Sequence, residues 1–270
     1  MGMNIARSTT EFSPTEVNAF LKLALQCDDV QDPDSFRGWC REEVRAFLPF
    51  GMLIVATGSL THGLLFVDNL LGVDYPDEFM QQILRRVPLN ERKVIQTWLS
   101  CRQPQIVTPT DIETNLSDLE RFEFLSFDLR NFAAHGVINP TGTHASYFSF
   151  ARVAEPLGSK TRKKLKLLAP HLHQALMAAL MPAPNTVPGP TAYSLFSPKQ
   201  LLVLRGLLEG LTNLQIASRV NRSPHTIKHQ VAQILKRLGA ANRSEAISKA
   251  LDLGIAVLPS GVGEIDTLAK

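Results

Sequence analysis

The stretch TNLQIASRVNRSPHTIKHQVAQILKRLG, residues 212–239, decides the fold of the C-terminal part of this chain. Its first four residues have the spacing of a helix-capping box, and Ser223-Pro224 supplies a cap and a first-turn proline for a second helix. Only residues 221 and 222 lie between the two helices, and Gly239 marks the end of the second. Two helices joined by so short a turn have the spacing of a helix-turn-helix.

The second helix of this pair divides into two faces. One stripe is apolar and should pack against other helices: Ile227, Val231, Ile234, Leu235 and Leu238. The opposite stripe is polar or small: His225, Lys228, His229, Ala232 and Lys236. A basic stripe with a small residue at its middle allows a helix to enter the major groove of DNA. The hydroxyls of Ser223 and Thr226 at the helix start can hold a phosphate. A merely solvated charged face is the alternative interpretation.

Two further helices flank this pair, with capping signals at Ser197 and Asn242. Glycines at positions 210, 239 and 254 mark helix ends. We therefore expect residues 194–258 to form a compact four-helix domain. Basic residues outnumber acidic ones in it: Lys199, Arg205, Arg219, Arg222, Lys228, Lys236, Arg237, Arg243 and Lys249 against Glu209, Glu245 and Asp252. Since the whole chain has a net charge of +3, the remainder is mildly acidic, and the basic domain is the one suited to nucleic acid.

The segment Phe196–Ala250 resembles the LuxR-type helix-turn-helix domain. The matching positions are Gly210-Leu211-Thr212-Asn213, Ile216-Ala217, Ser223, Thr226-Ile227-Lys228, Leu238-Gly239 and Asn242-Arg243-Ser244-Glu245-Ala246. The resemblance implies a transcription regulator that binds double-stranded DNA. Because one recognition helix reads only one half-site, we expect a homodimer, formed through the helix Ser244–Leu253 or the amphipathic helix Lys160–Met181.

The resemblance also implies roles for individual residues. Lys228, His229 and Ala232 would face the bases, and the helix Ser244–Leu253 would form a dimer contact. Contacts with the DNA backbone are implied for Thr226, Gln230, Lys236 and Arg237. The expected DNA-binding residues are, in full, Ser223, His225, Thr226, Lys228, His229, Gln230, Ala232, Gln233, Lys236 and Arg237.

A few positions depart from the usual family pattern. Gln200 stands where the family usually has Glu, Gln230 where it has His, Gln233 where it has Asn, and Arg237 where it has Lys. All four keep hydrogen-bonding or charge capacity, so we expect the same fold with an unusual operator preference.

A linker separates this domain from the rest of the chain. Residues 181–190, MPAPNTVPGP, contain four prolines and a glycine and cannot sustain a helix or a central strand. We expect a sensory or dimerisation domain at 1–181, a Pro-rich linker at 182–193, the helix-turn-helix domain at 194–258 and a tail at 259–270.

The first domain shows helical and strand patterns in alternation. Helices are expected from Ser13-Pro14, over Ser35–Phe47, near Asp77–Arg86 and Asn90–Ser100, and from Ser159 to about Met181. Strands are expected over Phe50–Gly58, Gly63–Asp68, Phe132–Ile138 and Tyr147–Val153. Helices flanking a central antiparallel sheet make an α+β domain.

The order of these elements resembles the ligand-binding domain of LuxR-type quorum regulators, and comes nearest to the branch associated with exopolysaccharide gene clusters (EpsA-like). The residues that carry this resemblance are FDLRNFAAHGV at 127–137, SYFSF at 146–150 and LAPHLH at 168–173. It implies a signal-input domain and control of exopolysaccharide genes. The tryptophan, tyrosine and Asp-Pro that hold acyl-homoserine lactones are not evident around Tyr75–Val94, where Phe79 replaces the tryptophan, which argues against a lactone.

Two interpretations of the first domain stay open. It is either a receiver of a small molecule of unknown identity or a ligand-free platform for dimerisation or partner docking. A closed apolar cavity of several hundred Å³ would favour the ligand, and a filled core would favour the platform. A phosphorylated receiver and an ATPase input are excluded, because neither the acidic cluster at strand ends nor a phosphate-binding loop is present.

Other features of the sequence offer little chemistry. No nucleophile–base pair or pair of catalytic carboxylates is recognisable, so we expect no enzyme activity and no cofactor. Cys27, Cys40 and Cys101 are far apart, which argues against disulfides and a metal site. The chain has no apolar run of the roughly 18 residues that span a bilayer, and no signal peptide, so we expect a cytoplasmic protein without a membrane partner.

Three groups of residues have a functional and a structural interpretation. His171 and His173 lie on different sides of one helix and cannot share a metal, so surface or interface roles are favoured. His135 could line a pocket, but a hydrogen-bonded structural histidine is the favoured interpretation. The basic run at 160–166 could touch DNA, but the solvated side of an amphipathic helix is favoured.

Overall fold

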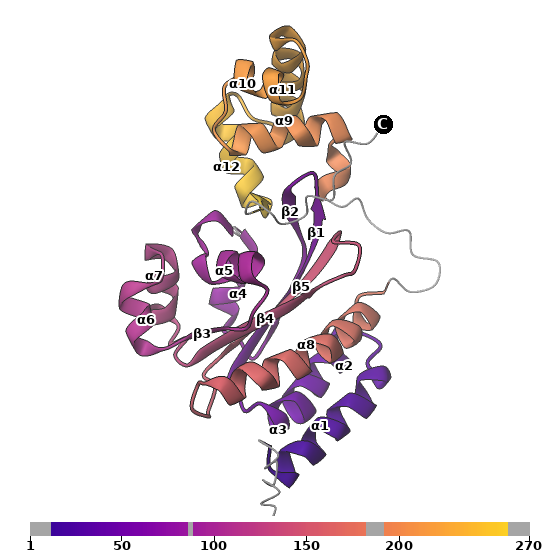
Figure 1. The fold of residues 1–270 in the computed structure, drawn as a ribbon, viewed down its shortest axis with the longest axis vertical. Helices are drawn as coiled ribbons and strands as arrows, with labels where there is room; N and C mark the ends of the chain where they lie inside the picture. Colours follow the sequence, from indigo (N-terminus) through magenta and orange to yellow (C-terminus); the bar gives the residue numbers. More distant parts are fainter. Residues whose placement is uncertain (1–11, 86–88, 182–191, 259–270) are drawn as a thin grey trace, which may run out of the picture.

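The computed structural model describes residues 12–85, 89–181 and 192–258. In the N-terminal domain, helices cover both faces of a central antiparallel sheet, and the C-terminal helices form a separate bundle at one end of that sheet (Figure 1). The predicted fold class, an α+β domain followed by an all-α domain, is confirmed. No helix within the described residues is both long and apolar enough to cross a membrane.

The sheet has the strand order β3-β4-β5-β1-β2-β6, and every neighbouring pair is antiparallel. Its strands are β1 (Met52–Thr61), β2 (Leu64–Val73), β3 (Gln105–Val107), β4 (Phe132–Ile138), β5 (His144–Ala151) and β6 (Ile255–Val257). β1 and β2 form a long hairpin whose turn, His62-Gly63, has φ angles of 52° and 72°. This left-handed backbone suits a two-residue hairpin turn. The four predicted strands are present, and β1 and β2 extend further than expected.

One face of the sheet is covered by α1 (Pro14–Gln26), α2 (Pro33–Trp39), α3 (Arg45–Phe47) and α8 (Ser159–Ala179). A π-helical turn at Cys40–Val44 joins α2 to α3, so the single helix predicted from Ser35 is a composite that starts earlier, after the Asp32 cap. The apolar stripe of α8, including Leu168 and Leu172, is fully buried in this layer. That stripe is therefore used within the domain.

The opposite face is covered by α4 (Asp77–Arg85), the 3₁₀ turn η3 (Leu89–Glu91), α5 (Lys93–Cys101), α6 (Pro109–Thr114) and α7 (Asp118–Ser126). β3, α6 and α7 were not predicted. α7 does carry a readable signal, because Ser117 caps it and Glu120 returns the hydrogen bond. β3 is a three-residue strand at the sheet edge, too short to give a periodic pattern.

The C-terminal bundle consists of the 3₁₀ turn η4 (Ala192–Leu195) and the helices α9 (Pro198–Leu208), α10 (Asn213–Arg219), α11 (Pro224–Leu238) and α12 (Arg243–Asp252). Each helix begins at its predicted cap. The side chains of Ser197, Thr212, Ser223 and Asn242 accept hydrogen bonds from the backbone N–H three residues further on. The predicted glycine ends are present too, with φ of 78° at Gly210, 61° at Gly239 and 72° at Gly254.

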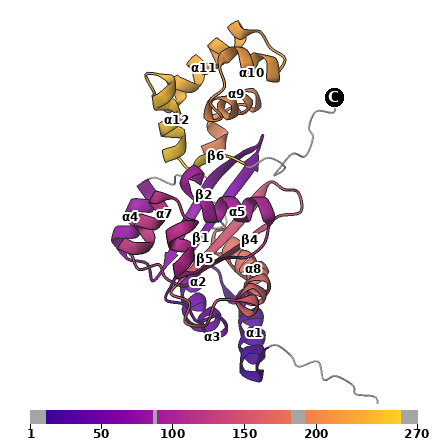
Figure 2. The ribbon, with the colours of Figure 1, turned by 60° about the vertical axis from the view of Figure 1, so that its left-hand side comes forward.

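The two domains share a hydrophobic cluster. After α12 the chain returns to the sheet, where β6 pairs with β2 (Figure 2). Leu64 and Phe66 of β2 are fully buried in the same cluster as Leu204 of α9 and Ile234 of α11. The end of the β1–β2 hairpin therefore completes the core of the C-terminal bundle.

Candidate nucleic-acid interface

α11 presents a polar stripe to solvent and an apolar stripe to the bundle. Ile227 and Ile234 on the inner stripe are 1% and 0% exposed. The side chains on the outer stripe are exposed: His225, Lys228, His229, Ala232 and Lys236. This division follows the helical period of the sequence, which places residues three and four apart on one face.

The start of α11 is tightly organised. The Ser223 hydroxyl accepts a hydrogen bond from the backbone N–H of Thr226 at 3.1 Å and contacts its hydroxyl at 2.8 Å. Asn221, with φ of 50°, gives the left-handed residue on which the turn after α10 depends. The backbone N–H groups of the first turn and both hydroxyls lie at the surface, where they can bind an anion.

Two of the predicted DNA-binding side chains are already engaged within the protein. Gln233 accepts a hydrogen bond of 2.9 Å from Gln200, which is 2% exposed, so the pair links α11 to α9. The Arg237 guanidinium donates to the backbone carbonyl of Leu195. Gln230 is half-buried, and its Oε1 has no hydrogen-bond partner among the described residues. Gln230 is thus partly covered by the bundle, whereas Gln233 and Arg237 are exposed although they are hydrogen-bonded to it; the remaining predicted residues are exposed as well.

Two cations that the sequence analysis did not select lie beside the start of α11. Lys199 and Arg222, both exposed, line a small groove of about 90 Å³ together with Thr226 and Gln230. The groove lies where α9, the turn and α11 meet, so these charges add to the positive N-terminal end of α11. Arg222 could have been predicted from the sequence, because it directly precedes Ser223, the cap of α11.

The N-terminal domain contains a cavity between the sheet and α4, α5 and α7. It has a volume of about 90 Å³ and is lined mainly by apolar side chains, among them Ala56, Val67, Leu70, Phe79, Ile83 and Phe132. Its polar lining includes Arg92, which donates two hydrogen bonds of 2.7 Å to Glu123. Tyr75 and Tyr147 also line it, and burial raises the pKa of both, so their hydroxyls stay protonated donors.

The cavity lies against the sheet, but it is smaller than the several hundred Å³ that would favour a ligand. Phe79, which stands in place of the tryptophan of lactone receptors, lies in its wall together with Tyr75. The centroids of the two stacked rings are 4.9 Å apart. Glu120 accepts a hydrogen bond of 3.0 Å from the backbone N–H of Val94. The polar groups of the wall therefore converge on one region inside an apolar shell.

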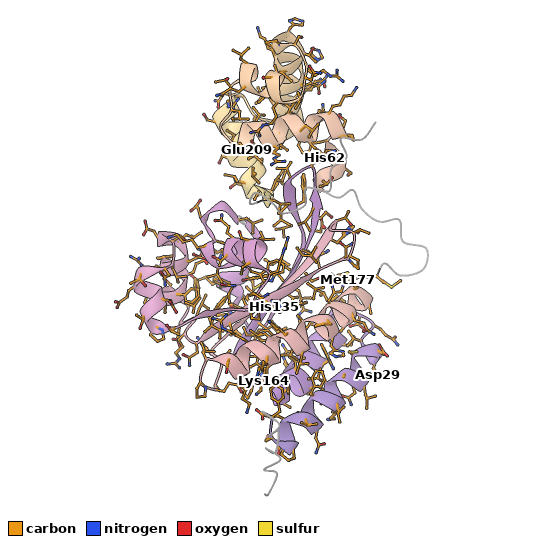
Figure 3. The ribbon with its side chains drawn as sticks, viewed as in Figure 1. Asp29, His62, His135, Lys164, Met177 and Glu209 are labelled. Atoms are coloured by element: carbon orange, nitrogen blue, oxygen red, sulfur yellow. The ribbon has the colours of Figure 1, made fainter. Side chains whose placement is uncertain are left out.

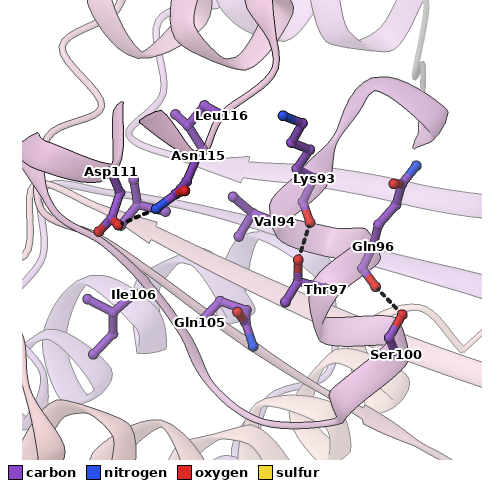
Figure 4. Close-up of a pocket in the computed structure, with 11 residues that line it drawn as sticks. Lys93, Val94, Gln96, Thr97, Ser100, Gln105, Ile106, Asp111, Asn115 and Leu116 are labelled. Atoms are coloured by element: carbon purple, nitrogen blue, oxygen red, sulfur yellow. Dashed lines mark hydrogen bonds between the residues drawn. The ribbon is translucent and has the colours of Figure 1, made fainter. Parts of the chain in front are cut away.

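A second, open groove of about 660 Å³ lies between α5, β3 and α6 (Figure 4). Its hydroxyls are satisfied by their own helix, because Thr97 donates to the carbonyl of Lys93 at 2.8 Å and Ser100 to that of Gln96 at 3.0 Å. Asn115 likewise donates to Asp111 at 2.8 Å. These three side chains are therefore already hydrogen-bonded within the protein.

The histidines that stood out in the sequence lie apart from one another. His171 contacts the Phe20 ring, whereas Nδ1 of His173 lies 2.8 Å from the Ser146 hydroxyl. His135, on β4 beneath α8, is 9% exposed (Figure 3). Burial, with a smaller effect of Lys166, lowers the pKa of His135 to about 4. The expectation of a hydrogen-bonded His135 was wrong for Nδ1, which has no partner among the described residues.

In the basic run on α8, Arg162, Lys163 and Lys166 are exposed, but Lys164 is structural. Lys164 is 1% exposed and forms ion pairs of 2.5 Å with Glu155 and 2.9 Å with Glu16. Although burial alone would raise the pKa of Glu16, hydrogen bonds from Lys160, Lys164 and Ser13 lower it well below its usual range. Lys164 is thus not on the solvated side of the helix, as the sequence suggested, but ties α8 to α1.

The cysteines and acidic residues form no further site. Cys27, Cys40 and Cys101 are free thiols, and burial raises the pKa of Cys40 well above its usual value. Among residues 12–85, 89–181 and 192–258, no group of three or more His, Cys, Asp or Glu side chains could hold a metal ion.

Residues 194–250 match the family model of bacterial regulatory proteins of the luxR family. No curated protein sequence matches the chain. The crystal structure of SdiA from Escherichia coli is 15% identical and covers 88% of this chain and 98% of its own, with a TM-score of 0.50. SdiA in complex with octanoyl-rac-glycerol is 15% identical and covers 90% of this chain and 97% of its own, also with a TM-score of 0.50.

The sequence match covers the part of the chain that contains α9, α10, α11 and most of α12. The likeness to SdiA, at this identity, concerns the fold, and it extends over both domains. The helix-turn-helix geometry of α10 and α11 and the exposed basic stripe agree with that assignment. Residues 194–250 thus form a helix-turn-helix domain of the type found in bacterial regulatory proteins of the luxR family, behind an N-terminal domain of the SdiA fold.

Proposed function

We propose that this protein binds a specific double-stranded DNA sequence as a homodimer and regulates transcription in response to a small molecule held in its N-terminal cavity. The exposed stripe of α11, opposite a stripe that is buried in the bundle, carries the proposal. A helix with this division can enter the major groove without disturbing the core behind it.

The residues of α11 divide by position. His225, Lys228, His229 and Ala232, all exposed, are proposed to face the bases. Ser223, Thr226 and Lys236 are proposed to contact the DNA backbone. Gln230, Gln233 and Arg237 remain part of the proposed site, but their burial or internal hydrogen bonds favour a role in holding α11 at the correct angle.

Dimerisation is proposed through α12, because the apolar stripe of α8 is already buried within the N-terminal domain. α12 ends beside Leu253, which is 46% exposed. Two α11 helices must be held about one helical turn of DNA apart to read both half-sites. Light scattering after size exclusion should give twice the chain mass at micromolar concentration, with or without DNA. A strictly monomeric protein under both conditions contradicts the dimer.

The cavity supports a signal-input role, with a ligand that is apolar and carries a small polar head near Arg92 and Tyr75. Its volume of about 90 Å³ favours the second candidate, a ligand-free platform, since ligand pockets usually measure about 300–1,000 Å³. Octanoyl-rac-glycerol, seen bound to SdiA, is a suitable probe. A dose-dependent rise in melting temperature that Tyr75→Phe weakens supports the ligand; no rise with acyl probes of any length supports the platform.

The proposed target, exopolysaccharide genes, rests on the resemblance of residues 127–137, 146–150 and 168–173. Selection of duplexes from a random pool by the purified full-length protein tests specific binding without assuming a target. Footprinting on DNA upstream of exopolysaccharide genes then tests the target itself. If selection enriches no sequence, the proposal of specific DNA binding fails; if it enriches one that is absent upstream of those genes, only the target fails.

A further inference from the structure

The short strand β6 joins the two domains by backbone and side-chain contacts. It pairs with β2 in the register Leu64↔Val257, Leu65↔Ala256 and Phe66↔Ile255. The pairing is closed at both ends, because Val67 N–H donates to the Gly254 carbonyl at 3.1 Å and Leu258 N–H to the Gly63 carbonyl at 2.9 Å. β6 therefore belongs to the N-terminal sheet although it follows the last helix of the C-terminal bundle.

Successive side chains of β6 point to different domains, as the alternation of a strand requires. Ile255 is fully buried in the cluster that includes Leu204 and Ile234 of the helix-turn-helix domain. Ala256 and Leu258, 5% and 4% exposed, are buried in a different cluster, formed with residues of η3 and α5. One face of β6 thus contacts the DNA-binding domain and the other contacts the cavity layer.

The cavity wall and the cluster that packs against β6 share several residues. Leu89 and Ile95 line the cavity and also pack in the cluster of Ala256 and Leu258. Val67 lines the cavity and also packs closely against Gly254, the residue before β6. A Cβ added at Gly254 would lie only 3.0 Å from the Val67 Cβ. A single layer of side chains therefore separates the contents of the cavity from the strand.

We propose that β6 is a latch through which the state of the N-terminal cavity controls DNA binding. Filling the cavity displaces Val67, Leu89 or Ile95, and a close-packed interior transmits such a displacement to the strand seated on them. The strand in turn positions the helix-turn-helix domain through Ile255. This inference rests on the proposed DNA-binding function, and its test separates the two.

Two substitutions open the latch in the full-length protein. Ala256→Asp places a carboxylate among apolar side chains of the cavity layer, while the bundle-facing side of β6 stays intact. Gly254→Ala is milder, combining backbone strain at φ of 72° with the close approach to Val67. Gly210→Ala is its matched control, because Gly210 has φ of 78° but an added Cβ would meet nothing within 4 Å.

Ala56→Leu serves as an internal probe of cavity occupancy. Ala56 lines the cavity from β1, between its partners Leu70 and Tyr147, and the longer side chain fills part of the space. Should this variant fail to fold, Ile83→Ala enlarges the same cavity from α4 and takes its place. Amide exchange of residues 255–258 reports whether the latch is closed in each variant.

The decisive measurement is affinity for a duplex selected from a random pool by the wild-type protein. We expect Ala56→Leu to change this affinity about fivefold or more with the latch intact, in both the wild-type and the Gly210→Ala backgrounds. With Ala256→Asp the same substitution should change affinity less than about twofold, and with Gly254→Ala the effect should be intermediate.

Two outcomes overturn the latch and leave DNA binding standing. In one, the cavity substitution has the same effect whether the latch is open or closed. In the other, neither Ala56→Leu nor Ile83→Ala changes the affinity or the exchange of residues 255–258 in any background. Failure of the wild-type protein to enrich any duplex would instead refute the proposed DNA-binding function and, with it, the latch.

Discussion

Phe66→Ala tests whether the hairpin end is part of the core of the DNA-binding domain. Phe66 lies on β2 of the N-terminal domain, yet its side chain is 0% exposed in a cluster made mainly of helix-turn-helix residues. Replacing a fully buried Phe with Ala costs about 3–5 kcal/mol, which includes the cavity that is left behind. Since domains are stable by only about 5–15 kcal/mol, the change should remove a large part of the stability of the bundle.

Urea unfolding of the full-length protein gives the free-energy change, and amide exchange locates it. We expect faster exchange in α9 and α11, whose buried residues share the cluster with Phe66, and unchanged exchange in α8, whose buried residues belong to a separate cluster. Phe122→Ala, at a position that is 57% exposed on α7, is the matched control and should change stability by less than about 0.5 kcal/mol. A cost below about 1 kcal/mol for Phe66→Ala, or unchanged protection of α9, would refute the shared core.

Three further predictions follow from single side chains. Lys228→Ala should cost about 1–3 kcal/mol of binding free energy on the specific duplex and reduce discrimination against random duplexes, whereas Lys236→Ala should weaken binding to all duplexes equally and lower the slope of the salt dependence by about one. Binding isotherms at several salt concentrations test both; if Lys228→Ala weakens specific and random binding equally, Lys228 is a phosphate contact. Burial opposes protonation of His135 and lowers its pKa from 6.5 to about 4, so the free energy of unfolding should fall as the pH drops from 6.5 towards 4, by roughly 3 kcal/mol at most. In urea unfolding, His135→Leu should flatten this part of the pH profile. Lys164→Met should cost about 3 kcal/mol in urea unfolding because it removes the ion-pair partner of Glu155 and one of the two lysines paired with Glu16, against little change for the exposed Lys166→Met; equal effects would contradict the buried ion pair.

Local signals were enough to predict the helix-turn-helix. The caps at Ser197, Thr212, Ser223 and Asn242 act within one turn of chain, so they can be read from adjacent residues. The two stripes of α11 likewise follow from helical period alone. The same logic predicted β4 with its observed bounds, because a continuous apolar run indicates a strand that is buried on both faces.

Features that depend on distant partners were not predictable. Ile255-Ala256-Val257 is too short to indicate a strand, and only its pairing with β2, far earlier in the chain, makes it one. The strand predicted over Gly63–Asp68 is present, but the sequence did not indicate that Leu64 and Phe66 pack against the helix-turn-helix domain. Similarly, the basic run on α8 gave no sign that Lys164 meets Glu16 and Glu155, since ion pairs across a fold leave no local pattern.

The position of the recognition helix limits how the N-terminal domain can control it. The outer stripe of α11, including Lys228 and His229, is exposed while β6 is paired with β2. The N-terminal domain therefore cannot control DNA binding by covering this stripe, because the stripe stays exposed when β6 is paired with β2. Among the described residues, the cluster shared by the two domains lies at the hairpin end and β6, where Ile255 and Phe66 are buried. A signal that acts through this contact changes the orientation of the bundle, and in a dimer the relative orientation of two bundles decides whether both α11 helices reach successive major grooves.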